Sequence, residues 1–185
     1  MTTRTRTSLD AYFALAETKP YLEFIDGEVI QKPMVGKRHS RIVADLIFEL
    51  GAYLRSTGEA SVDTELRHLR RDDQWVFLPD ISVTLNARAG GVPAETADPV
   101  EVMPDFAIEV LSPDDQPGRV TQRIARYMSA GIPLLWVIDP EGERVTVWRP
   151  GEAPRDLSAP AILTGAPVLP GFELDLAALF ARLHT

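Results

Sequence analysis

An apolar run over residues 103–111 constrains the fold of this chain more than any other segment. From Phe106 to Leu111 the residues are apolar at both odd and even positions, with Glu109 as the exception. Successive side chains of a strand point to opposite faces of the sheet, so a strand that is apolar at both parities is covered on both sides. We therefore expect this segment to be a central strand between two layers of structure.

The rest of the chain alternates between helical and extended patterns. Residues 38–56 carry the clearest helical signal, because Ile42, Leu46 and Leu50 recur on one face. Asp26-Gly27 is typical of a hairpin turn within residues 21–31. Further helices are predicted over residues 8–17, over 115–130 and after Leu174. Strands are predicted over residues 59–69, 75–85, 134–138, 144–149 and 162–168. Residues 86–101 are predicted to form a surface loop. This order predicts an α/β fold with a central mixed β-sheet flanked by α-helices.

Length and composition indicate a single globular domain. The 185 residues are expected to form one domain over residues 1–185, with residues 1–10 as a candidate flexible N-terminal arm. No apolar run approaches the length of a membrane span, so we expect no membrane association and a cytoplasmic location. The chain has no cysteine, which excludes disulfides, thiolate metal sites and a cysteine nucleophile.

The charge of the chain bears on nucleic-acid binding. The net charge of −8 argues against strong nonspecific binding, because Lys and Arg contacts to phosphates supply most of that affinity. A local basic groove is still compatible with this charge. Two clusters are candidates for it: Arg67, His68, Arg70 and Arg71 in one, and Arg119, Arg123 and Arg126 in the other. The charge therefore disfavours a tight DNA binder but not an enzyme that acts on DNA transiently.

Two carboxylates lie in or beside predicted buried strands. Asp80 follows Leu78-Pro79, and Glu109 lies inside the apolar run. A buried carboxylate must be paired, metal-bound or protonated, because burying it alone is costly. Mg²⁺ or Mn²⁺ held by one or two carboxylates can activate water for phosphodiester hydrolysis. Pro-Asp also marks ordinary turns, so the alternative for Asp80 is a loop cap, whereas Glu109 favours a functional site.

The ordered set of motifs resembles the Uma-two family of restriction endonucleases, within the PD-(D/E)xK nuclease superfamily. The resemblance covers about residues 11–183 and rests on segments 22–28, His39, 78–83, 105–113, 126–140 and 169–172. It implies a restriction-endonuclease-like fold, a Mg²⁺ (or Mn²⁺) site at Asp80 and Glu109, DNA as substrate and often a homodimer. Asp80, Glu109 and Arg123 are the catalytic residues that it implies.

The lysine expected in this family is absent from its two usual positions. Leu111 occupies the place two residues after the glutamate, and Arg123 occupies the place on the following helix, one turn before Tyr127. All lysines (Lys19, Lys32, Lys37) lie in the first 37 residues, so we expect no lysine beside the carboxylates. Arg123 would then stand in for it, with weakened catalysis, because arginine stays protonated and cannot act as a base.

Three further residues are candidate supporting groups. Glu23 and Glu28 lie on the hairpin that the family places near the site, and the alternative is a solvated hairpin face. His39 opens the long helix and is either a phosphate or water ligand or an ordinary residue of a helix N-terminus.

Two functions from different classes remain open on the sequence. The first is a Mg²⁺-dependent DNA endonuclease, weakened by the change of lysine to arginine. The second is a catalytically inactive, dimeric binding or regulatory module, which the missing lysine and the acidic composition favour.

Overall fold

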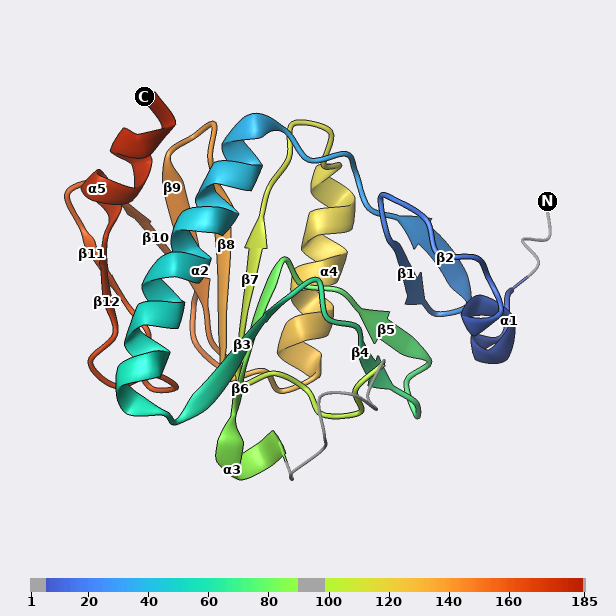
Figure 1. Cartoon of the computed structure of the whole chain (residues 1–185). Coiled ribbons are helices and arrows are strands. Elements are labelled where there is room, and N and C mark those ends of the chain that lie inside the picture. The colour runs from blue at the N-terminus through green and yellow to red at the C-terminus, as the bar shows by residue number, and fades with distance from the viewer. Residues whose placement is uncertain (1–5, 90–98, 185) are drawn as a thin grey trace.

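The structure, a computed structural model, describes residues 6–89 and 99–184. A central sheet lies between helices, and a smaller sheet packs to one side of it (Figure 1). Of the proposed N-terminal arm, residues 1–5 lie outside the described ranges. Within the remainder, Thr7 N–H donates to the Gly27 carbonyl, and helix α1 begins at Leu9.

The central sheet has six strands in the order β10-β9-β8-β7-β6-β3. Strands β7 and β8 are parallel and the other neighbours are antiparallel, so the sheet is mixed. The strands are β3 (Ala60–Thr64), β6 (Ile81–Leu85), β7 (Phe106–Val110), β8 (Leu134–Asp139), β9 (Arg144–Trp148) and β10 (Arg155–Ser158). Parallel neighbours require a crossover connection, which α4 (Pro117–Ser129) supplies between β7 and β8.

Alternate residues of β7 determine which helix covers each face. Phe106, Ile108 and Val110 pack in the larger core together with α2 (Lys37–Thr57). Ala107 lies in a second core with Tyr127 of α4. The residues of β7 are all buried, so the prediction of a central strand covered on both faces is confirmed. Glu109 has the parity of Ala107, which places its carboxylate on the α4 face.

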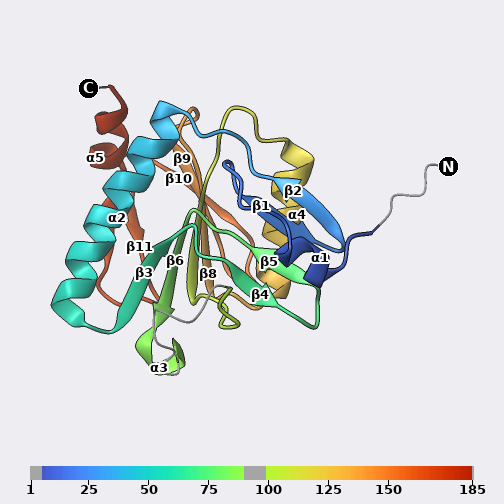
Figure 2. The same cartoon turned by 45° about the vertical axis from the view of Figure 1, so that its right-hand side comes forward.

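The smaller sheet joins two distant parts of the chain in the order β2-β1-β5-β4. Its strands are β1 (Leu22–Ile25), β2 (Glu28–Gln31), β4 (His68–Arg70) and β5 (Trp75–Phe77). Helix α1 (Leu9–Phe13) packs against it, and Leu9, Tyr12, Phe24, Leu69 and Val76 form a separate apolar cluster. Figure 2 shows this sheet beside α4 and away from α2.

The C-terminal part closes the α2 side of the central sheet. Strands β11 (Ile162–Thr164) and β12 (Glu173–Asp175) form a two-stranded sheet, followed by α5 (Leu176–Ala181) and a 3₁₀ turn over Arg182–His184. The predicted buried stripe of Leu176, Leu179 and Phe180 is confirmed.

Three predicted strands were wrong in extent. Of residues 162–168, only Ile162–Thr164 form a strand, β11. Residues 59–69 form β3 and β4 in different sheets, and the break contains Glu65, which has a left-handed backbone with φ of 51°. Residues 75–85 likewise split into β5 and β6 around Leu78-Pro79-Asp80, where proline removes a ladder donor. The predicted loop 86–101 begins with a short helix, α3 (Asn86–Ala89), and residues 90–98 lie outside the described ranges. The other predicted helices, the hairpin and the strands near 134–149 are confirmed within a few residues.

Candidate active site

The strand register brings Asp80 and Glu109 together. Ile81 of β6 pairs with Ile108 of the antiparallel β7, so the preceding Asp80 lies across from the following Glu109. Asp80 Oδ2 accepts a hydrogen bond of 2.8 Å from Val110 N–H. The two residues are only 4% and 3% exposed. The structure therefore brings the two carboxylates together, with Glu109 on β7 and Asp80 directly before β6.

Helix α4 supplies the partners of Glu109. Tyr127 donates its hydroxyl proton to Oε1, and the Arg123 guanidinium donates to Oε2 at 2.7 Å. Arg123 also contacts Asp115 at 3.2 Å, through its other terminal nitrogen. Arg123 thus bridges two carboxylates, one on the strand and one at the start of the helix.

The expectation that no lysine lies beside the carboxylates was wrong. Lys32, the residue after β2, places Nζ 2.7 Å from Asp80 Oδ1 and 2.8 Å from the Leu78 carbonyl oxygen. Its side chain is almost completely buried, at 8% residue exposure. Lys32 and Asp80 are 48 residues apart in the chain, so local spacing could not reveal their contact.

His39 also contacts Asp80. Its Nε2 lies 3.2 Å from Asp80 Oδ2, and its ring is buried against the site from the first turn of α2. Of the two readings offered by the sequence, the structure therefore places His39 at the carboxylates. Its contact is with Oδ2 of the Asp80 carboxylate, whereas Lys32 contacts Oδ1.

Glu23 and Glu28 differ in their relation to the site. Glu23, on β1, is buried and lies close enough to Arg123, Lys32, Glu109 and Asp80 to interact with all four charges. Glu28, on β2, is half-buried and lines the cavity that opens beside Lys32. Glu23 is therefore a member of the buried charge cluster, and Glu28 belongs to its rim.

A cavity of about 450 Å³ gives access to this charge cluster. Its walls come from the hairpin and from the start of α4. Polar members include Glu23, Glu28, Lys32, Asp115, Arg119 and Arg123. Cations and anions therefore both line a space large enough to admit part of a ligand.

Electrostatics keep Asp80 and Lys32 ionised. Burial alone would raise the pKa of Asp80, but the Lys32 ammonium and the hydrogen bond from His39 outweigh it, so the pKa lies below its ordinary value. Burial would lower the pKa of Lys32, yet Asp80, Glu109 and Glu23 together raise it above the ordinary value. Burial raises the pKa of Glu23 against the opposing effect of Arg123. Burial and the neighbouring Glu109 likewise raise the pKa of Tyr127. The Asp80–Lys32 pair is thus charged at neutral pH.

The carboxylates retain acceptor capacity for a divalent cation. A carboxylate offers about four acceptor positions, and hydrogen bonds from the described residues occupy three on Asp80 and two on Glu109. Hard carboxylate oxygens are the donors that Mg²⁺ prefers, and Mg²⁺ often takes only one or two from the protein. Within residues 6–89 and 99–184 there is no group of three or more His, Asp or Glu arranged to hold a metal. The residues therefore fit a cation bound by two carboxylates with water or substrate as its other ligands.

The proposed basic groove does not form from the two arginine clusters. Arg71 pairs with Glu101, Arg70 with Asp73 and Arg67 with Glu17. His68 is buried. Of the second cluster, Arg126 binds Asp26, which leaves Arg119 and Arg123 at the cavity.

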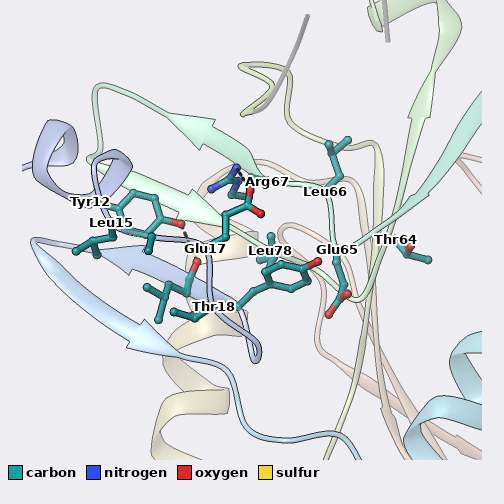
Figure 3. A pocket seen from close by; sticks show the side chains of 12 residues that line it. Tyr12, Leu15, Glu17, Thr18, Thr64, Glu65, Leu66, Arg67 and Leu78 are labelled. Carbon is teal, nitrogen blue, oxygen red and sulfur yellow. Dashed lines mark hydrogen bonds and ion pairs between the residues drawn. The ribbon is translucent and has the colours of Figure 1, made fainter. Parts of the chain in front are cut away.

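A second hollow lies on the other side of the small sheet, between α1 and the chain around Thr64–Arg67 (Figure 3). It has a volume of about 200 Å³ and shares no lining residue with the cavity at Lys32. The Arg67–Glu17 pair crosses it at 3.8 Å. None of the residues proposed for catalysis lines this hollow.

The layered fold and its buried carboxylates define a nuclease-like α/β protein, and comparisons with known proteins agree. The chain belongs to the Uma2 family, whose model, described as "Putative restriction endonuclease", matches residues 9–177. It is also similar to the crystal structure of a "putative nuclease belonging to DUF820" from Anabaena variabilis ATCC 29413. The two are 30% identical with a TM-score of 0.83, over 95% of this chain and 98% of that chain. None of the curated proteins matches this chain in sequence.

These comparisons confirm the resemblance and the restriction-endonuclease-like fold expected from the sequence. Among the described residues, no helix combines the length and the apolar character that crossing a membrane requires.

Proposed function

We propose that this protein is a metal-dependent DNA endonuclease that hydrolyses phosphodiester bonds, with Mg²⁺ or Mn²⁺ held by Asp80 and Glu109. The observation that carries the proposal is the pair of buried carboxylates on adjacent strands, each with acceptor positions left, beside a cavity that holds cationic side chains. The family and the similar crystal structure support a nuclease-type hydrolase.

The bound cation would polarise the phosphate and lower the pKa of a coordinated water. The residues of the chain prepare this site in advance. Val110 N–H and His39 fix the Asp80 carboxylate, while Tyr127 and Arg123 fix Glu109. Fixed groups need no reorganisation when charge develops on the phosphoryl oxygens, which is the main source of electrostatic catalysis. Arg119 at the cavity wall provides positive charge for a phosphodiester backbone.

The proposal includes a homodimer, as the family resemblance implies, and the cytoplasmic location expected from the sequence. Met34 and Val35, which follow Lys32, are 68% and 48% exposed, so apolar surface lies beside the cavity. Sedimentation equilibrium of the purified chain tests this part, and a monomer at all concentrations would remove the dimer from the proposal without affecting the site.

A second candidate is an inactive binding module. It is favoured by the internal pairing of the site, because Lys32 and Arg123 already neutralise Asp80 and Glu109. In that case the cluster would be a buried ion-pair network that fixes the position of α4 and the hairpin.

The experiment that separates the two is calorimetric titration with Mg²⁺ and Mn²⁺, followed by a plasmid-nicking assay on the same preparations. The variants are Asp80→Asn and Glu109→Gln. Asp105→Asn is the matched control, because Asp105 is equally buried and ion-paired, with Arg88, but lies at the opposite end of the β6–β7 pair.

The nuclease proposal expects wild type and Asp105→Asn to bind metal and nick DNA, and the two site variants to lose both. Addition of EDTA should stop nicking and excess Mg²⁺ should restore it. If none of the four proteins binds metal or nicks DNA, the inactive module is established instead.

A further inference from the structure

We propose that Lys32 is the catalytic lysine of this site, brought to it by the N-terminal hairpin instead of by the glutamate strand or by α4, and that its ammonium donates directly to a phosphate oxygen of the DNA. This inference rests on the proposed nuclease function and names a residue that acts in it.

The path of the chain explains how a residue so far from Asp80 reaches it. Lys32 N–H bonds to the Tyr21 carbonyl at 2.9 Å, which extends the hairpin ladder one residue beyond β2. Strand β1 pairs with β5, and β5 leads through Leu78 and Pro79 to Asp80. The end of the hairpin and the residue before β6 are therefore fixed to the same small sheet.

The break between β5 and β6 creates the acceptor that orients Lys32. The Leu78 carbonyl accepts from Nζ at 2.8 Å, and Asp80 Oδ1 accepts at 2.7 Å. Two acceptors of this kind fix the position of an otherwise flexible side chain. The ammonium is held within a buried site, where its charge acts through a lower dielectric than in water.

The ammonium has a donor left for a ligand. An ammonium carries three N–H groups, and the described residues accept from two of them. Lys32 also lines the cavity, together with Arg119 and Arg123. A phosphate oxygen entering this space can therefore accept from Lys32 while the contact with Asp80 is kept.

Arg123 has a different role. Both of its terminal nitrogens are engaged, one by Glu109 and the other by Asp115. Its bridging contacts hold α4 against the strand, so we assign it as a positioning residue for Glu109. The lysine that is absent from α4 is thus compensated by another lysine, and the arginine in its place maintains the geometry.

The first test observes the ammonium itself. The chain has only three lysines, so labelling lysine with nitrogen-15 gives a spectrum in which Lys32 is assigned by its loss in the Lys32→Met variant. The probe is a duplex oligonucleotide added in the presence of Ca²⁺. The proposal requires the Nζ resonance of Lys32 to shift when the duplex is added, and a resonance that does not respond overturns it.

The second test is plasmid nicking by Lys32→Met and by its matched control Lys37→Met, which removes the same charge from an exposed position at the start of α2. Removal of one preorganised donor lowers the turnover rate about 100-fold to 1,000-fold. We expect this loss for Lys32→Met and wild-type nicking for Lys37→Met, with metal binding retained in both.

The outcomes separate the two proposals. If wild type nicks DNA and Lys32→Met nicks equally well, the assignment of Lys32 is wrong and the nuclease function stands. If wild type neither binds the duplex nor nicks it, the nuclease function fails first. If Lys32→Met does not fold, the Lys32 resonance is assigned by elimination with Lys19→Met and Lys37→Met, and the resonance test on wild type remains decisive.

Discussion

The buried histidine of the small sheet should make the protein sensitive to mild acid. His68 has no solvent exposure, and its Nδ1–H donates to the Val102 carbonyl at 2.8 Å. Its Nε2 is buried and has no hydrogen-bond partner among the described residues. Burial lowers the pKa of His68 from 6.5 to about 4, against the opposing effect of the bond to Val102. Protonation of Nε2 would place a charged donor where nothing accepts from it.

The sign and size of the effect follow from linkage. Because the folded pKa is the lower one, the unfolded chain takes up the proton first as the pH falls, so stability is complete above about pH 6.5 and is lost toward pH 4. The difference in pKa corresponds to about 3 kcal/mol in full, of which about 2 kcal/mol is lost by pH 5. The raised pKa of Glu23 acts in the opposite direction below its folded pKa, so wild type alone does not isolate the histidine.

The assay is urea unfolding from pH 8 to pH 4 of wild type and His68→Asn. Asparagine keeps a donor near Nδ1 but cannot titrate, so the stability difference between the two proteins should change by about 2 kcal/mol between pH 8 and pH 5. His184→Asn is the control, since His184 is exposed and this variant keeps His68. A difference that stays constant with pH would refute the account, because it would mean that His68 is protonated alike in folded and unfolded chains.

Four other substitutions test the contacts of the site and of the hairpin. Arg123→Met leaves Glu109 buried with one partner fewer and should lower the free energy of unfolding by about 3–5 kcal/mol in urea. Arg123→Lys, which keeps the charge but cannot bridge two carboxylates, should cost about 1.5–3 kcal/mol and should not raise nicking; higher nicking would mean that Arg123 is a weakened catalytic residue. Tyr127→Phe removes the donor to Glu109 Oε1 and should cost about 1–3 kcal/mol by the same measurement, and an unchanged stability would show that this bond contributes nothing. Arg126→Ala removes the pair with Asp26 and the guanidinium placed 4.3 Å from the Trp75 ring centre, and should cost about 1–2 kcal/mol and speed hydrogen exchange of the hairpin amides; unaltered exchange would contradict this role.

The central sheet and the two carboxylates could be predicted from the sequence because the signals are local. The two-sided apolar pattern of β7 follows from burial on both faces. A carboxylate buried within such a strand must be paired, metal-bound or protonated. The apolar face of α2 is equally plain, and its predicted members Ile42, Leu46 and Leu50 are buried. The family resemblance then placed Asp80 and Glu109 in one site. They lie 29 positions apart along the chain, and the pairing of β6 with β7 brings them opposite each other.

Lys32 could not be found in this way because its place depends on how two sheets dock. Nothing within a few residues of Lys32 marks it as buried, and Gln31 before it is exposed. The one available signal was its position directly after a hairpin that the family places near the site, in a chain with only three lysines. The splits within residues 59–85 were missed for a related reason, since the residues pass from one sheet to the other without a glycine at the break near Glu65.

The separate apolar cluster of the small sheet has a consequence for how the charge cluster responds to local unfolding. Leu9, Tyr12, Phe24 and Val76 pack with one another and not in the cores beneath α2 and α4, so we expect the hairpin to open as a unit of its own. Lys32 and Glu23 belong to that unit, whereas Asp80, Glu109 and Arg123 belong to the larger one. If the hairpin opens, Asp80 loses its ammonium partner Lys32, whereas Glu109 keeps its partners on α4. Under the proposed function, the affinity of the site for a cation would then depend on the fraction of molecules in which the hairpin is docked.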